Sequence, residues 1–249
     1  MKTKLFSIGI LFLALLVCTN CSKEEILPTP PGETSALKTA PVESYVVTVV
    51  PNGTNDTEAI RAAFDEAIAA GPGSIVYLTE GTFYLTEPID LVDFKGSLLG
   101  AGKDLTEIVT QELNAVNNCF LSFSGTYSVT IADLSFRYND IQGYTDYLSA
   151  VIFNPSELIN QVNVQRVGIV GISDQFVHHK WALGLLFFGT FEDQIMTNAV
   201  IEQCTFQDAG EAIKIYNMLE STLLVKENQF INCNSGLVEF NTFDSYVEI

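Results

Sequence analysis

Basic residues are scarce in this chain of 249 residues, which has 12 lysines and arginines against 30 aspartates and glutamates. Only Arg61, Arg137 and Arg166 are arginines. No segment therefore offers the cluster of cations that binds a phosphate backbone, and we expect no nucleic-acid partner. The excess of acid also repels polyanionic sugars, because the field of the whole surface acts on an approaching ligand, so a neutral ligand is favoured.

Charged residues as a whole are few, at 17%, while 47% of the chain is hydrophobic, which excludes a disordered or collagen-like protein. The length fits one domain of ordinary to large size, or two small ones. Beyond the N-terminal region only Cys119, Cys204 and Cys233 remain, without a CxxC spacing. The sequence therefore does not predict a metal site built from cysteine.

The N-terminus has the pattern of a secretory signal. Lys2 and Lys4 precede an apolar run over 5–17 that is too short to span a bilayer. The following segment, Cys21-Ser-Lys-Glu-Glu, resembles the start of mature Gram-negative lipoproteins. We predict a signal peptide over 1–20 and lipidation of Cys21, with Cys18 as the alternative acceptor and plain secretion or a periplasmic protein as the alternative fate.

Cleavage before Cys21 removes two lysines and leaves 10 basic against 30 acidic residues, a net charge of −20. Acyl chains on the cysteine would hold the protein on the outer membrane or cell surface, since each buried CH₂ contributes about 0.8 kcal/mol. Residues 21–44 contain four prolines and no apolar periodicity, so we expect an extended tether there. The domain itself is predicted over 45–249.

A helix is predicted over Thr54–Ala70, capped by Asn55 or Asp56 and ended by Gly71 in the left-handed conformation. Glu58 stands three residues after Asn55, as in a capping box. One face of this helix is apolar at helical spacing and must cover an apolar surface: Ile60, Ala63, Phe64, Ala67 and Ile68. Strand patterns follow over 74–78, 82–85 and 97–99.

The stretch formed by 52–60, 73–85 and 98–102 resembles the N-terminal entry of the pectate lyase superfamily of right-handed parallel β-helices. In that superfamily the helix caps the open N-terminal end of the solenoid. The resemblance implies an all-β fold, a single-stranded right-handed parallel β-helix with an N-terminal capping α-helix. It brings no catalytic residues, because the superfamily includes enzymes and non-enzymes.

An internal repeat predicts a solenoid independently. Ile201-Glu-Gln-Cys-Thr-Phe206 and Val225-Lys-Glu-Asn-Gln-Phe230 lie 24 residues apart, and similar segments begin at Ile131 and Val164. A second strand of each coil is read at 150–153 and 184–187. One further coil places Val247 on Leu223 and would leave the last rung uncapped, so we expect missing C-terminal coils or a partner that covers the open end.

Two coils are enlarged between their first and second strands. The distance from Phe206 to Ala212 is six residues, whereas Phe136 to Ala150 is 14 and Ile169 to Gly184 is 15. Enlarged loops on consecutive rungs must stack on one edge, because rungs lie about 4.8 Å apart. Such insertions tend to form the binding face of a repeat protein.

Both histidines and the single tryptophan lie in these two loops. Aromatic rings suit stacking on sugars, and Asp and His supply hydrogen bonds or proton transfer. The alternative is that the aromatic rings cover the small cores of the loops. We predict catalytic roles for Asp140, Asp174 and His178. The predicted substrate-binding residues are Tyr138, Tyr144, Asp146, Tyr147, His179, Lys180 and Trp181.

Cleavage of a glycosidic bond needs two carboxyl groups, which Asp140 or Asp146 with Asp174, or Asp208 with Glu211, would supply. Elimination at a uronate, with Lys180 and the histidines, is less expected because basic groups are few. We find neither the paired-aspartate and Gly-His-Gly pattern of polygalacturonases nor the arginine-rich calcium site of pectate lyases. No motif indicates a cofactor, and no spacing demands Ca²⁺.

The sequence thus predicts a surface lipoprotein that acts on a polysaccharide, as a hydrolase more than as a lyase. The alternative is a non-catalytic module for glycan binding or adhesion.

Overall fold

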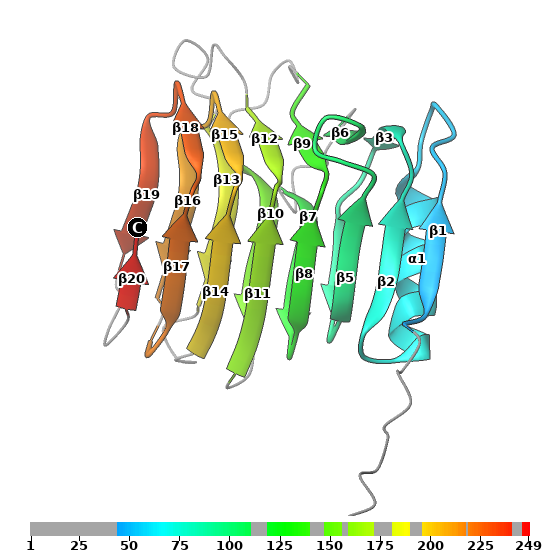
Figure 1. Ribbon diagram of the computed structural model, residues 1–249, viewed down its shortest axis with the longest axis horizontal. Coiled ribbons are helices and arrows are strands. Elements are labelled where there is room, and N and C mark those ends of the chain that lie inside the picture. Colours follow the sequence, from blue (N-terminus) through cyan, green and yellow to red (C-terminus); the bar gives the residue numbers. More distant parts are fainter. Residues whose placement is uncertain are drawn as a thin grey trace, which may run out of the picture. The chain divides into compact units, whose positions relative to one another are not determined.

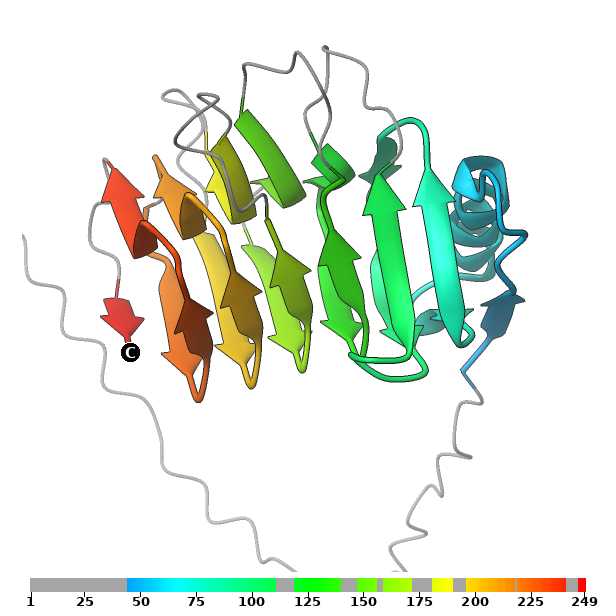
Figure 2. The ribbon, with the colours of Figure 1, turned by 90° about the horizontal axis from the view of Figure 1, so that it is seen from above.

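The computed structural model describes residues 44–110, 119–139, 147–155, 159–171, 181–189, 196–217, 219–240 and 246–249. Three parallel sheets run along one axis, and the strands of each sheet stack along it (Figures 1 and 2). Each coil of the chain contributes one strand to each sheet in turn, which makes a parallel β-helix. Sheet A contains β1 (Val46–Val49), β2 (Ser74–Leu78), β5 (Lys95–Gly100), β8 (Ser128–Ala132), β11 (Ile159–Gln165), β14 (Met196–Glu202), β17 (Thr222–Lys226) and β20 (Tyr246–Glu248).

The other two sheets have six strands each among the described residues. Sheet B contains β3 (Gly81–Leu85), β6 (Thr106–Thr110), β9 (Ser135–Arg137), β12 (Gly168–Val170), β15 (Thr205–Gln207) and β18 (Gln229–Ile231). Sheet C contains β4 (Ile89–Val92), β7 (Cys119–Gly125), β10 (Tyr147–Pro155), β13 (Trp181–Phe188), β16 (Glu211–Tyr216) and β19 (Ser235–Phe240). Strand residues alternate between the interior and the outer face, because the side-chain period of a strand is two.

The register predicted from the repeat is confirmed. Ile131 pairs with Val164, and the latter with Ile201, which in turn pairs with Val225. Val247 pairs with Leu223, as the extension of the repeat predicted. Inside the solenoid, phenylalanines of consecutive rungs stack, with ring centroids 5.6 Å apart for Phe123 and Phe153 and 4.8 Å apart for Phe153 and Phe187.

Each segment that the sequence presented as one strand is in fact two strands that meet at a sharp corner. The corner between sheets A and B is a single residue in the left-handed conformation, with φ of 59° at Asp133, 52° at Arg166, 57° at Gln203 and 56° at Glu227. This corner was not predicted, because glycine, the usual mark of a left-handed residue, is absent from these four positions. The following residue points inward, and Asn228 there bonds to the backbone, accepting from the Cys204 N–H and donating to the Ile201 carbonyl at 2.8 Å each.

Helix α1 (Thr57–Ala70) packs against the first strands of sheet A and covers the N-terminal end of the coils, as predicted (Figure 2). The ring of Phe64 meets Phe94 edge to face at 5.1 Å. Asn55 accepts from the Thr57 N–H, while Glu58 pairs with Arg61 instead of completing a capping box. Gly71 ends the helix with φ of 102°, and Ile68 is 37% exposed, so it lies at the edge of the apolar face.

In the described part of the chain, no helix combines the length and the apolar character that crossing a membrane requires.

Candidate functional site

The two enlarged loops leave the corner between sheets B and C on adjacent rungs. Arg137 at the end of β9 pairs with Val170 at the end of β12, and Tyr147 at the start of β10 pairs with Trp181 at the start of β13. The strands that flank the loops therefore place both at one edge of the solenoid. A third connection, 111–118, leaves the neighbouring rung at the same corner between β6 and β7, and the sequence reading missed it.

Most of the predicted site residues lie outside the described residues: Asp140, Tyr144, Asp146, Asp174, His178, His179 and Lys180, together with Cys21. Tyr147 and Trp181 are described only as the first residues of their strands.

Tyr138 is a core residue that anchors the bases of both loops. It is 4% exposed, and its hydroxyl donates to the carbonyl oxygens of Leu148 at 3.1 Å and Leu183 at 2.7 Å. Its ring packs against Phe120 at 5.0 Å, and burial raises the pKa of its phenol well above the usual value. Tyr138 thus ties together the strands that follow the loops and has no surface left to stack on a sugar.

The outer face of sheet C carries an aromatic pair at the ends of β13 and β16, at the edge opposite to the one where the enlarged loops leave. Phe188 and Tyr216 are register partners, with ring centroids 5.8 Å apart, and Phe188 is 39% exposed. The Lys214 ammonium lies 5.6 Å from the centroid of the Tyr216 ring and 2.7 Å from a carboxylate oxygen of Glu211. We call these four residues, with their rung neighbours Ser122, Ser124, Asn154 and Leu186, the sheet C face.

Along the axis, the side chains of the sheet C face change from polar to aromatic. Ser122 and Ser124 of β7 and Asn154 of β10 offer hydroxyl and amide groups, and the rings of β13 and β16 follow. Flat apolar rings next to hydrogen-bonding groups are the combination that a sugar ring, with its apolar faces and polar rim, requires. This surface therefore has the groups that contact with a sugar ring requires, and its aromatic pair lies at the edge of sheet C away from the corner from which the enlarged loops leave.

A groove of about 510 Å³ lies on the outer face of sheet B. Lys103, in the turn between β5 and β6, crosses sheet B and donates to the Thr205 hydroxyl at 3.1 Å. Gly168 makes room for it, because a Cβ at that position would lie 3.3 Å from Cγ of Lys103. The polar lining of this groove comprises Glu80, Thr82, Asp104, Glu107, Ser135 and Gln207.

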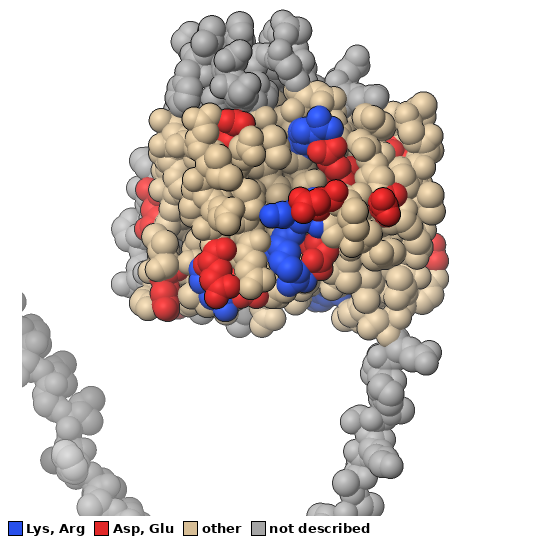
Figure 3. Space-filling view, turned by 45° about the horizontal axis from the view of Figure 1, so that its top comes forward, with Lys and Arg blue, Asp and Glu red and all other residues tan. Residues whose placement is uncertain are grey.

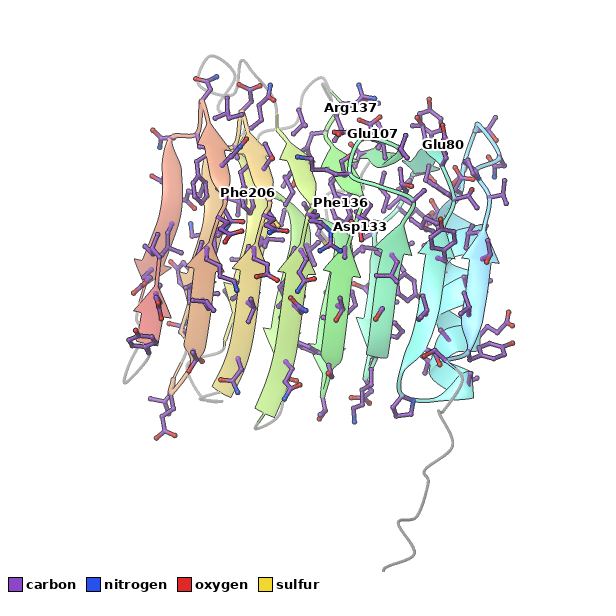
Figure 4. All side chains as sticks on the ribbon, in the orientation of Figure 1. Glu80, Glu107, Asp133, Phe136, Arg137 and Phe206 are labelled. Atoms are coloured by element: carbon purple, nitrogen blue, oxygen red, sulfur yellow. The ribbon has the colours of Figure 1, made fainter. Side chains whose placement is uncertain are left out.

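Glu107, which lines this groove, and two carboxylates outside it are paired with cations. The Arg137 guanidinium donates to both oxygens of Glu107 at 2.7 and 2.6 Å (Figure 4). These hydrogen bonds raise the pKa of Arg137 above its usual value. Asp133 with Arg166 and Glu202 with Lys226 form ion pairs between neighbouring rungs. Blue and red side chains accordingly lie side by side in Figure 3. These carboxylates act as structural partners of cations and are not free for proton transfer.

The two carboxylates of the alternative catalytic pair, Asp208 and Glu211, also have partners within the protein. Asp208 accepts hydrogen bonds from Gln207 at 3.1 Å and from Asn232, and Glu211 is ion-paired to Lys214. Within the described ranges, no group of three or more His, Cys, Asp or Glu side chains could hold a metal ion.

The buried thiols are inert. Burial raises the pKa of Cys119 to about 12 and that of Cys204 to about 11, so both remain protonated at neutral pH. Cys204 is 1% exposed and belongs to the core of the solenoid.

No protein-family model matches the chain, and no curated protein matches it. Among solved structures it is similar to ORF18 of Geobacillus virus E2, with 15% identity and a TM-score of 0.31 over 80% of this chain. The chain spans 59% of the length of that protein. It is also similar to the pectin methylesterase PemA from Erwinia chrysanthemi, with 10% identity and a TM-score of 0.31 over 82% of this chain and 89% of that one. Likenesses this weak carry nothing about function.

Proposed function

We propose that this protein is a cell-envelope lipoprotein whose β-helix binds a polysaccharide on the sheet C face. The observation that carries the proposal is the aromatic pair of Phe188 and Tyr216 on consecutive rungs, the first exposed and the second half-buried, beside hydroxyl and amide groups. The signal sequence and Cys21 support its attachment to the outer membrane or cell surface, with the tether over 21–44 between the anchor and the domain.

Cleavage of the bound glycan is the second part of the proposal. Asp140 and Asp174 belong to loops whose flanking strands lie on adjacent rungs, at the edge where the strands of sheet C begin, so a glycan that reaches them from Phe188 must run across sheet C along the strands. Two carboxyl groups about 5–5.5 Å apart retain the anomeric configuration, and about 6.5–9.5 Å apart they invert it. Hydrolysis is favoured over elimination, because most of the described cations are committed to carboxylates. A glycan-binding or adhesion module without turnover is the alternative.

The test compares binding and product release in one experiment. The full chain is run through affinity gels that contain neutral or uronate polysaccharides, and the release of reducing or unsaturated ends is measured in parallel. Loss of the Phe188 ring in Phe188→Ala removes about 1–2 kcal/mol of stacking and apolar contact, or about 5- to 30-fold in affinity. Tyr45→Ala is the matched control, since Tyr45 is an aromatic residue that is 47% exposed at the N-terminal end.

Asp140→Asn and Asp174→Asn separate the two functions. A hydrolase loses turnover in these variants and keeps its affinity, whereas a binding module releases no product from the outset. Equal retardation of wild-type protein and Phe188→Ala on every gel would refute the sheet C face as the glycan site.

A further inference from the structure

A second surface with the properties of a ligand site lies on a different face of the solenoid. The outer face of sheet A is hollowed over β8, β11, β14 and β17, with a volume of about 480 Å³. We call this the sheet A hollow. All of its lining side chains are uncharged: Ser128, Val129, Thr130, Gln161, Val162, Asn163, Asn198, Ala199, Val200, Thr222 and Leu224.

The register of the strands arranges the polar lining in rows along the axis. One row runs from Ser128 through Gln161 and Asn198 to Thr222, and all four of these residues are exposed. A second row begins with Thr130 and Asn163 and continues with Val200 and Leu224. Since successive rungs lie about 4.8 Å apart, the first row repeats a hydroxyl or an amide at that interval.

The amides of the hollow have free hydrogen-bonding capacity. The side chains of Gln161 and Asn198 make no hydrogen bond with the described residues, and Oδ1 of Asn163 lacks a partner there as well. An amide that is not bonded within the protein can turn toward a ligand without losing a protein hydrogen bond, and an unsatisfied acceptor gains when a ligand hydroxyl reaches it.

The uncharged lining of the hollow favours a neutral ligand. The chain has a net charge of −18, yet the charged residues of these rows lie outside the hollow. Lys95 precedes Ser128 in the first row, and Glu248 follows Leu224 in the second. Glu202 and Lys226 lie in the row beyond the second, where they pair with each other. The hollow therefore offers no cation to an anionic sugar and no carboxylate to a basic peptide. A second copy of the chain is disfavoured by mutual repulsion.

We propose that the sheet A hollow binds a neutral, linear glycan that lies along the axis of the solenoid and exchanges hydrogen bonds with the first row and with Thr130 and Asn163 of the second, while Val200 and Leu224 offer apolar contact. This inference rests on the proposed function, because it takes polysaccharide as the ligand of the protein. It adds a second contact surface and assigns to it the neutral class of sugar.

The test uses the full chain on affinity gels containing dextran, a soluble mixed-linkage β-glucan or a galactomannan. The double variant Gln161→Ala/Asn198→Ala removes two amides from the exposed row, and we expect retardation on at least one gel to weaken about tenfold. The matched control is Gln229→Ala/Asn234→Ala, which removes the same two residue types from exposed positions away from sheet A. Urea unfolding of each variant confirms that it is folded.

Each outcome distinguishes this inference from the proposed function. Binding that is lost in Gln161→Ala/Asn198→Ala, and kept in the control, supports the hollow whatever Phe188→Ala does. Binding that depends on Phe188 and not on the two amides overturns the inference and leaves the proposed function standing. No retardation of the wild-type protein on any neutral gel overturns it too, as does a dimer in sedimentation that the double variant dissociates.

Discussion

Replacement of Phe153 by alanine tests whether the stacked phenylalanines hold the middle of the solenoid together. Phe153 is 0% exposed and stacks on both neighbouring rungs, at 5.6 and 4.8 Å. Removal of a buried phenylalanine costs about 3–5 kcal/mol. With a urea dependence of about 3 kcal/mol per molar, a loss of about 4 kcal/mol lowers the unfolding midpoint by about 1.3 M.

Phe153→Leu is the control, because leucine keeps most of the buried apolar volume and removes only the ring contacts. We expect it to cost about a third as much as Phe153→Ala, since each ring pair contributes about 0.5–1.5 kcal/mol beyond area. Circular dichroism during a urea titration measures both midpoints. A loss below about 1 kcal/mol for Phe153→Ala would refute the inference that the stack is tightly packed, because cavity formation is then cheap there.

Three further predictions concern charges, thiols and the groove on sheet B. Arg166→Met should lower the unfolding free energy by less than about 1 kcal/mol, measured by urea titration, because its ion pair is exposed. The raised pKa values of Cys119 and Cys204, about 12 and 11 against an ordinary 9.0, should make stability fall as pH rises above 9, where only unfolded thiols ionise. Cys204→Ala should reduce this alkaline loss in the same titration repeated at pH 8 and 10. Gly168→Ala should displace the Lys103 stem and speed amide exchange over 101–105, and unchanged exchange would contradict the close contact.

The sequence predicted the parts of the fold that depend on the interior. The 24-residue repeat yielded the pairing of Ile201 with Val225, because inward residues of a solenoid are apolar on every rung. It did not reveal the corners between sheets A and B, where Asp133 and Arg166 adopt the left-handed conformation without glycine. Tyr138 was misjudged because a tyrosine beside a loop looks the same in sequence whether its ring faces solvent or the core.

The surfaces were harder to predict than the interior. Ser128, Gln161, Asn198 and Thr222 form one row only because four strands are in register, although they span almost a hundred positions of the chain. None of them stands out in its own segment. The pairing of Phe188 with Tyr216 likewise depends on the register of β13 and β16. Neither residue lies in the enlarged loops, where the site was predicted.

The bond from Lys103 to Thr205 gives this solenoid a property that stacked repeats usually lack. In most repeat proteins each coil touches only the next one, so an end can unravel without disturbing the middle. Here a turn that precedes β6 is fastened to β15, three strands further along sheet B and 102 residues away in the chain. Fraying that starts at the C-terminal coils must break this hydrogen bond when it reaches β15, so the opening of β15 also releases the turn that holds Lys103, three rungs ahead of the frayed end.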